Sequence, residues 1–231
     1  MKKIIMLVLA AILFASAQDS TGYRFGVAMG VNFSKIFTSD ESVSRIWPPT
    51  YKAGYTVGVI MEKQINRRTS FQFGLLYREA GSKWGQPLFG LGYDGDYAIY
   101  KLRYISLPFY YKLKSNIGTL LKNFDFCIGL VYSYNIFAEK QFVEEIDPPP
   151  GEDRTYNPGP SNIRDEINLH EFGLTVGVKI PIGADWSVSV TYYRALNELY
   201  KDKTIIYPDD LNNKDTFVNS NFSVSVEYFI F

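Results

Sequence analysis

Apolar and polar residues alternate with a period of two along most of the chain, and this pattern constrains the fold most strongly. Between residues 23 and 33, bulky apolar side chains occupy every odd position, whereas Gly, Ala, Arg and Asn occupy the even ones. Such alternation indicates a β-strand with two unlike faces. It recurs in seven further segments, at 53–61, 71–77, 105–113, 124–134, 172–180, 186–192 and 222–230. The sequence therefore predicts an all-β domain of eight strands.

The N-terminus has the three parts of a secretory signal peptide. Met1-Lys2-Lys3 is basic, residues 4–14 are apolar, and Ala15-Ser16-Ala17 is a small-residue triplet of the cleavage-site kind. The apolar run is too short for a membrane-spanning helix, which needs about 20 residues. We therefore expect a signal peptide at residues 1–17 and a single barrel domain at 18–231.

The connections between the predicted strands alternate in length. Long polar connections are expected at 35–50, 81–98, 140–168 and 198–216, and short ones at 64–69, 115–123 and 182–185. Outer-membrane barrels have this alternation, because their short turns face the periplasm and their long loops face outside. The pattern predicts an eight-stranded antiparallel transmembrane β-barrel of up-and-down topology, with both termini periplasmic.

A soluble barrel of the lipocalin kind also shows alternating apolar and polar residues. The bulk of the side chains on the two strand faces distinguishes it from a membrane barrel. The interior of an eight-stranded barrel has room for little more than its own side chains. The small polar face fits this interior, so the bulky face must point outward into lipid. Threading the strands also places aromatic residues at two levels, as in membrane barrels. The inner girdle is Tyr23, Phe71, Tyr111, Phe124, Trp186 and Tyr228, and the outer girdle is Phe33, Tyr55, Tyr77, Tyr134, Phe172 and Tyr192.

The composition argues against a nucleic-acid-binding protein and against a disulfide-stabilised one. The chain has 24 basic and 24 acidic residues, and removal of Lys2 and Lys3 leaves a net charge of −2. No basic stripe for nucleic acid is present. Cys127 is the only cysteine, so no intramolecular disulfide can form. We expect outer-membrane lipid as a partner and no nucleic acid.

The predicted interior carries charges of both signs. Two functions are open: an ion or solute path through a small channel, or a set of salt bridges that plugs a narrow barrel. Buried charges are tolerated when they are paired, which favours the plug. The residues are Arg24, Lys52, Glu62, Arg78, Lys112, Asp125, Glu171, Lys179 and Glu227.

Three features depart from the alternation of apolar and polar residues. Tyr100, Leu102 and Tyr104 are apolar but fall on the interior phase, which predicts a bulge or a strand that continues above the membrane. Pro108 cannot donate to a ladder and predicts a bulge or a local break. Phe231 lies one step out of phase, although a C-terminal aromatic residue is usual in outer-membrane barrels.

A lipid-modifying barrel hydrolase is a third possible function. His170 is the only histidine and falls on the lipid-facing phase, with Asn168 and Phe172 beside it, whereas Ser187 and Ser189 face the interior. A nucleophile and its base must lie within hydrogen-bond reach, so this arrangement disfavours an enzyme. We expect no catalytic, cofactor-binding or metal-binding residues, and no cofactor.

The third long connection is acidic and surrounds the segment Pro148-Pro149-Pro150-Gly151. It could be a surface for a cation or a partner, or a solvated loop, and the absence of EF-hand spacing favours the loop. If the protein has partners among outer-membrane or secretion proteins, we expect them at 140–168 and 198–216. Its acidic residues are Glu144, Glu145, Asp147, Glu152, Asp153, Asp165 and Glu166.

The segment Tyr104-Ile105-Ser106-Leu107-Pro108-Phe109-Tyr110-Tyr111-Lys112 resembles a motif of the PorT-like outer-membrane β-barrel family, common in the Bacteroidota. Ser106 stands where that family usually has Glu. In strand count and loop order the resemblance covers residues 22–231. It implies a location in the outer membrane of a Gram-negative bacterium. It also implies a non-enzymatic role as a scaffold or accessory component of an outer-membrane assembly, with type IX secretion as one such assembly.

Overall fold

The computed structural model of the chain describes residues 22–39, 44, 48–85, 97–115, 124–146, 154–156, 159–201 and 216–230. For 143–146 and 154–156 it describes the backbone alone. The expected signal peptide at 1–17 and Phe231 lie outside these residues.

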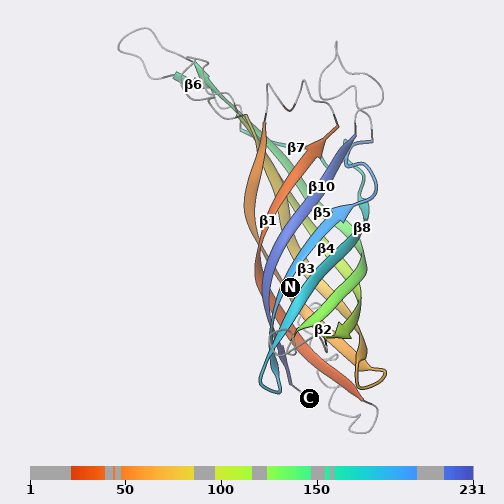
Figure 1. Ribbon diagram of the computed structural model, residues 1–231. Helices are drawn as coiled ribbons and strands as arrows, with labels where there is room; N and C mark the ends of the chain where they lie inside the picture. The colour runs from red at the N-terminus through yellow and green to blue at the C-terminus, as the bar shows by residue number, and fades with distance from the viewer. Residues whose placement is uncertain are drawn as a thin grey trace, which may run out of the picture.

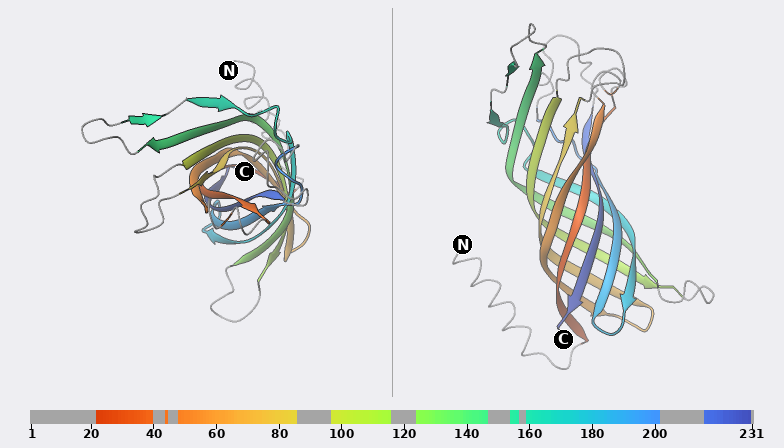
Figure 2. Two further views of the ribbon diagram at one scale, coloured as in Figure 1. Left: turned by 90° about the horizontal axis from the view of Figure 1, so that it is seen from above. Right: turned by 90° about the vertical axis from the view of Figure 1, so that its left-hand side faces the viewer.

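Eight long antiparallel strands form a closed barrel, as predicted (Figure 1). Each pairs with its neighbour along the chain, and the last pairs with the first, which closes the ring seen down the axis (Figure 2). The strands are β1 (Tyr23–Thr38), β2 (Pro49–Gln64), β3 (Thr69–Trp84), β4 (Tyr97–Lys114), β5 (Asp125–Ile146), β8 (His170–Ile182), β9 (Trp186–Ala195) and β10 (Phe217–Phe229). Two short strands, β6 (Arg154–Tyr156) and β7 (Pro160–Asn162), pair with the far end of β5.

The first and last described residues of the barrel lie at the end that carries the short turns. The amide of Gln64, at the start of the β2–β3 turn, donates to the carbonyl of Gly22 at 3.2 Å. The amide of Phe229 donates to the carbonyl of Asp185, in the β8–β9 turn, at 2.8 Å. We call this end the turn end, and the opposite end the loop end.

Several strands run further toward the loop end than the sequence predicts. β3 continues to Trp84, and β4 begins at Tyr97, although 81–98 was expected to be a loop. β5 runs to Ile146, inside the loop expected at 140–168, and β1 runs to Thr38. These predicted boundaries were wrong because the extended segments satisfy one another's backbone groups. Trp84 pairs with Ala98, for example, and Tyr97 pairs with Val143.

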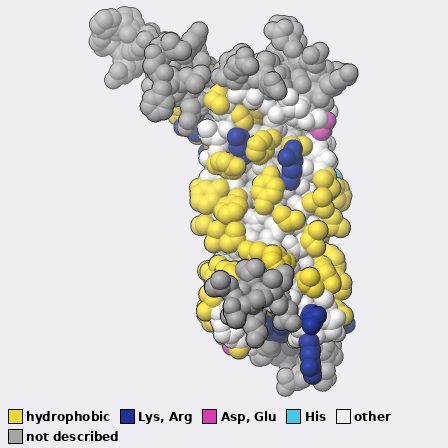
Figure 3. All heavy atoms as spheres, in the orientation of Figure 1, with side chains coloured by type: hydrophobic (Ala, Val, Ile, Leu, Met, Phe, Trp, Pro, Cys, Tyr) yellow, Lys and Arg dark blue, Asp and Glu magenta, His cyan; other side chains and the backbone are white. Residues whose placement is uncertain are grey.

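The bulky face of the strands points outward, as predicted. Figure 3 shows hydrophobic side chains over much of the barrel wall on the side facing the viewer. Rings from adjacent strands pack at both girdles, with Trp186 and Tyr228 at 4.5 Å between centroids and Tyr55 and Tyr77 at 5.5 Å. The most exposed members include Met29, Val31, Tyr55, Ile128, Leu130, Phe172 and Val176.

The apolar residues on the interior phase of β4 form a compact core at the loop end. Leu102 and Tyr104 are fully buried there, among residues from β1, β3, β5 and β10. The segments after β7 and β9 complete this core by turning into the mouth of the barrel. They contribute Ile163, Ile167, Leu199 and Tyr200. The predicted continuation of β4 beyond the regular alternation is confirmed. Its inward-facing residues are apolar there because they pack against other protein segments that fill the loop end.

Two irregularities lie on β4. The pairing with β5 shifts register between Arg103 and Tyr104, which confirms a bulge; Ile136 of β5 is the extra residue. At Pro108, pairing with β3 is interrupted between the Phe73–Phe109 and Leu76–Ser106 pairs, with no change in register. Pro108 therefore marks a local break in the ladder.

Candidate functional site

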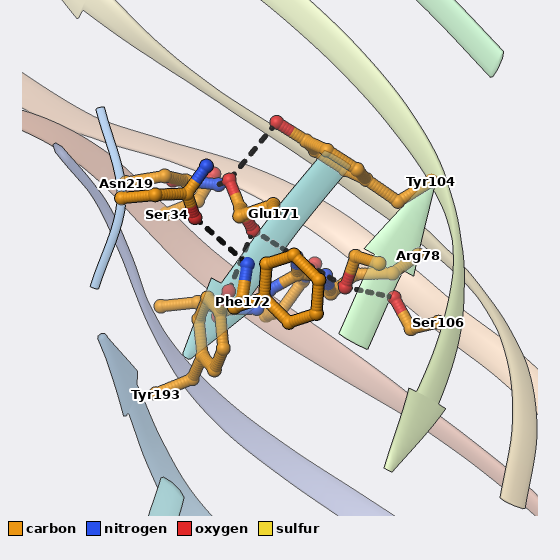
Figure 4. A network of polar contacts seen from close by, with 12 residues as sticks. Ser34, Arg78, Tyr104, Ser106, Glu171, Phe172, Tyr193 and Asn219 are labelled. Carbon is orange, nitrogen blue, oxygen red and sulfur yellow. Dashed lines mark hydrogen bonds and ion pairs between the residues drawn. The ribbon is translucent and has the colours of Figure 1, made fainter. Parts of the chain in front are cut away.

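The interior of the barrel is crossed by two layers of charged and polar side chains. The layer nearer the loop end centres on Glu171 of β8 and is called the Glu171 layer (Figure 4). The layer nearer the turn end centres on Lys179 of the same strand and is called the Lys179 layer. Both layers join strands that are not neighbours in the sheet, so their side chains span the lumen.

The carboxylate of Glu171 accepts hydrogen bonds on both oxygens. Oε1 accepts from the Arg78 guanidinium at 2.7 Å and from the Tyr193 hydroxyl at 2.8 Å. Oε2 accepts from the Tyr104 hydroxyl at 3.1 Å and from the Asn219 amide at 3.2 Å. Four donors from β3, β4, β9 and β10 therefore hold one carboxylate, which leaves little of its hydrogen-bonding capacity for a ligand.

The Arg78 guanidinium, which is hydrogen-bonded to this carboxylate, also contacts side chains of three other strands. It donates to the Ser133 hydroxyl at 3.3 Å, and Ser133 in turn bonds to Ser106 at 2.8 Å. Its planar group also lies over the rings of Tyr193 and Tyr104, at 4.5 and 5.0 Å from their centroids. Cation–π contacts of this kind add to the attraction between the ion pair and its surroundings. The Glu171 layer thus closes the lumen with six of the eight strands.

The Lys179 layer is built in the same way. Lys179 forms an ion pair with Glu227 of β10 and donates to Gln72 of β3. Gln72 and Ser187 each donate to Glu227 at 3.3 Å. Beside this group, Lys112 of β4 forms an ion pair with Glu62 of β2. Because every one of these charges is buried and paired, the layer is a fixed part of the structure.

Little free space remains inside the barrel. A cavity of about 70 Å³ lies between the layers, and its wall combines small polar side chains with aliphatic ones such as Ile60, Leu76 and Val131. A second cavity, of about 180 Å³, opens at the turn end beside Lys112, Lys114 and Asp125. The Lys179 layer separates the two, since Lys179 lines both.

Seven of the nine predicted interior charges are buried in the lumen, and two are not. Arg24 lies at the turn-end rim, where it donates to the carbonyl of Ala184 at 2.6 Å and covers the Phe229 ring. Lys52 pairs with Glu79 at 3.3 Å, next to a register shift in the β2–β3 pairing, and joins neither layer. Arg24 keeps the predicted inward phase, since it is the register partner of Glu62 and lines the turn-end cavity, but it lies too near the rim to join the plug. Lys52 is not in the plug because it lies in the register shift. The seven are Glu62, Arg78, Lys112, Asp125, Glu171, Lys179 and Glu227.

Sequence reasoning missed the roles of three uncharged members of the layers. Tyr193 and Asn219 hold Glu171, and Gln72 holds Lys179. All three lie on the interior phase. Extending the alternation past Tyr192 and ahead of Asn221 would have found the first two.

His170 lies on the outward face at the loop end, as predicted. Its Nδ1 and the Tyr132 hydroxyl are 2.7 Å apart, and its ring also packs against Tyr134. Ser187 and Ser189 point into the lumen, on the other side of the barrel wall. These residues therefore do not form a serine–histidine pair.

The acidic residues of the third long connection are only partly described. Asp165 and Glu166 lie on the segment that caps the loop end, and the carbonyl of Asp165 accepts from Lys201 at 3.0 Å. Asp147, Glu152 and Asp153 lie outside the described residues, and so does the Pro148–Gly151 segment.

Among the residues that are described, no group of three or more His, Cys, Asp or Glu could hold a metal ion. The described part of the chain also has no helix that is long and apolar enough to cross a membrane.

The barrel resembles solved bacterial outer-membrane proteins at low sequence identity. Neisserial surface protein A is 12% identical with a TM-score of 0.42, over 88% of this chain and 96% of that chain. CarO of Acinetobacter baumannii is 10% identical with a TM-score of 0.44, over 87% and 96%. The attachment invasion locus protein Ail of Yersinia pestis, in complex with the heparin analogue sucrose octasulfate, is 9% identical with a TM-score of 0.42, over 90% and 99%. Likeness at this level carries no functional argument.

Sequence comparison identifies the family. No functionally curated protein matches the chain. Residues 14–201, which include all the barrel strands except β10, match the family described as the outer membrane protein beta-barrel domain. The chain therefore belongs to the outer membrane protein beta-barrel domain family, and its place is the bacterial outer membrane.

Proposed function

We propose that this barrel is a non-enzymatic scaffold or accessory component of an outer-membrane assembly. The observation that carries the proposal is the Glu171 layer, which closes the lumen with a carboxylate held by four donors. A barrel sealed in this way serves as an anchor, and its interaction surfaces lie outside the lumen. The resemblance of residues 104–112 to the PorT-like family makes type IX secretion the first assembly to test.

The loop end is the surface that best suits a protein partner. β5 extends beyond the barrel and pairs with β6, so it forms an arm that projects from the wall (Figure 1). This arm belongs to 140–168, one of the two segments expected to contact a partner. The other, 198–216, is described only at its ends. In the proposed orientation the signal peptide at 1–17 is removed, both termini are periplasmic, and the arm is extracellular.

The test is purification in mild detergent with identification of the co-purifying proteins. We expect outer-membrane or secretion proteins to accompany the full-length chain, and to be lost when a short turn replaces residues 144–156. Retained heat-modifiable migration in gels will show that the shortened barrel is folded. Equal recovery of the same partners with and without the arm would place the contact elsewhere on the barrel.

A small channel for ions or solutes is the second candidate, and the two lumen cavities favour it. The cavity at the turn end has a mainly polar wall, and only the Lys179 layer separates it from the cavity between the layers. Planar-bilayer recordings distinguish the two functions. We expect the unmodified barrel to give no unitary current, because neither layer leaves a continuous water path. Steady, ion-selective unitary currents would reject the scaffold and support the channel.

A further inference from the structure

Two basic side chains lie close together on the outward face of the barrel, toward the loop end. Lys35 of β1 and Arg194 of β9 are both register partners of Ser220 in β10, the strand between them. Adjacent strands are about 4.8 Å apart, so the backbones of Lys35 and Arg194 are about 10 Å apart with Ser220 between them. The Ser220 hydroxyl donates to the Lys35 carbonyl at 3.3 Å. Figure 3 shows basic side chains set among hydrophobic ones on this part of the wall.

This pair lies one step beyond the outer girdle. Phe33 and Tyr192 of that girdle are both register partners of Phe222, two residues before Lys35 and Arg194 on their strands. Two residues of a strand span about 7 Å. Aromatic girdles mark the membrane–water interfaces, so the cations lie at the height of the lipid headgroups.

Aromatic rings hold the two cations in place. The Lys35 ammonium lies 4.9 Å from the centroid of Phe37 and 5.6 Å from that of Tyr51. The Arg194 guanidinium lies 5.9 Å from the same Phe37 ring. Because Phe37 is shared, the pair is one positively charged surface spanning β1, β2, β9 and β10.

Within the described ranges, neither Lys35 nor Arg194 has a carboxylate partner. Two other basic residues toward the loop end do have one: Lys101 pairs with Glu139 at 3.0 Å and Lys52 with Glu79 at 3.3 Å. An unneutralised pair of cations at headgroup height is complementary to an anionic lipid. An arginine and a lysine together suit a phosphate, which the guanidinium can bind through two hydrogen bonds.

We propose that Lys35 and Arg194 form a binding site for the phosphate of lipid A, the phosphorylated sugar lipid of the outer leaflet. The acyl chains of the lipid lie along the hydrophobic belt of β1, β10 and β9, and the phosphate lies over Ser220. The proposal rests on the orientation with the loop end outside, which is tested separately by cysteine labelling.

The test measures binding of purified lipid A to the detergent-refolded, full-length barrel by native mass spectrometry. We expect the protein to bind lipid A at least tenfold more tightly than enzymatically dephosphorylated lipid A. The double variant Lys35→Gln, Arg194→Gln should bind lipid A about 30-fold more weakly, which corresponds to about 1 kcal/mol for each cation. Its heat-modifiable migration establishes that it is folded.

A matched control replaces one lysine and one arginine by glutamine at the turn end of the barrel, which lies at the other side of the membrane. Lys63 lies over the Tyr23 ring of the inner girdle at 4.7 Å, and Arg67 is exposed in the β2–β3 turn. The double variant Lys63→Gln, Arg67→Gln should bind lipid A like the unmodified protein. Equal binding of phosphorylated and dephosphorylated lipid A by the unmodified protein would overturn the proposal without any variant. Competition by millimolar inorganic phosphate as strong as that by lipid A would also overturn it, because the site would then take free phosphate.

Discussion

The guanidinium of Arg78 and the carboxylate of Glu171 meet at 2.7 Å, although β4 and β5 separate their strands on the shorter way around the barrel. The contact therefore spans the lumen, and it is buried at both ends. Removal of one partner from such a pair leaves an uncompensated charge in a poorly solvated space.

Arg78→Ala should lower the free energy of unfolding by about 3–5 kcal/mol, because Glu171 stays buried without its cation. Urea titration of the barrel refolded into lipid vesicles measures this change. Arg24→Ala is the control: Arg24 lies at the rim and makes one hydrogen bond to a backbone carbonyl, so its loss should cost about 1 kcal/mol. Equal losses for the two variants would show that the Glu171 layer contributes no special stability.

Substitution of a lipid-facing residue should depend on depth in the membrane. Val176 is 50% exposed in the middle of β8, and Ile182 is 56% exposed at its turn end. Val176→Arg should destabilise the barrel by about 2–4 kcal/mol, whereas Ile182→Arg should cost about 0–1 kcal/mol near the interface. The same titration measures both. A silent Val176→Arg would mean that this face does not contact the hydrocarbon core.

Two leucines on opposite faces of β4 separate core packing from contact with lipid. Leu102 is 0% exposed in the apolar core of the loop end, and Leu107 is 48% exposed on the outward face. Leu102→Ala should cost about 2–5 kcal/mol, because it leaves a cavity among fixed side chains. Leu107→Ala should cost less, since mobile lipid chains fill the vacated space. The contrary order, in unfolding titrations of the two variants, would show that the loop end is loosely packed.

Cysteine labelling of intact cells tests the proposed orientation. Ser161, in β7 at the loop end, and Ala184, in the β8–β9 turn, are both exposed. A membrane-impermeant maleimide should modify Ser161→Cys and leave Ala184→Cys unmodified. The native Cys127 is buried, so the unmodified protein is the background control. Labelling of Ala184→Cys alone would invert the barrel in the membrane.

The face of each strand could be predicted from the sequence, but the ends of several strands could not. Alternation reports that one face contacts lipid, and Val176 shows it clearly because its neighbours on β8 follow the same pattern. The pattern fails at Tyr100 and Leu102, because the loop end of β4 is filled by an apolar core. A strand buried by protein in this way has no reason to alternate between apolar and polar residues.

The charges of the lumen were predicted as a set, but their partners were not. Which charged side chains pair with each other depends on how the strands are staggered across the barrel, and a local sequence pattern does not contain this information. Lys52 illustrates the difficulty, since it lies in the register shift between β2 and β3 and reaches Glu79. Arg78 and Glu171 are 93 residues apart in the chain, so only the closed barrel brings them together.

The part played by Asn219 in the Glu171 layer has a consequence for the order of assembly. Asn219 of β10 and Arg78 of β3 approach Glu171 from opposite sides of β8, and β10 forms the seam with β1. The donors therefore meet at one carboxylate only when the sheet has curled into a closed ring, and until then water can reach Glu171. Closure and dehydration of the interior thus become one cooperative event, so a chain truncated before β10 would keep an open, hydrated lumen that quality-control proteases can recognise.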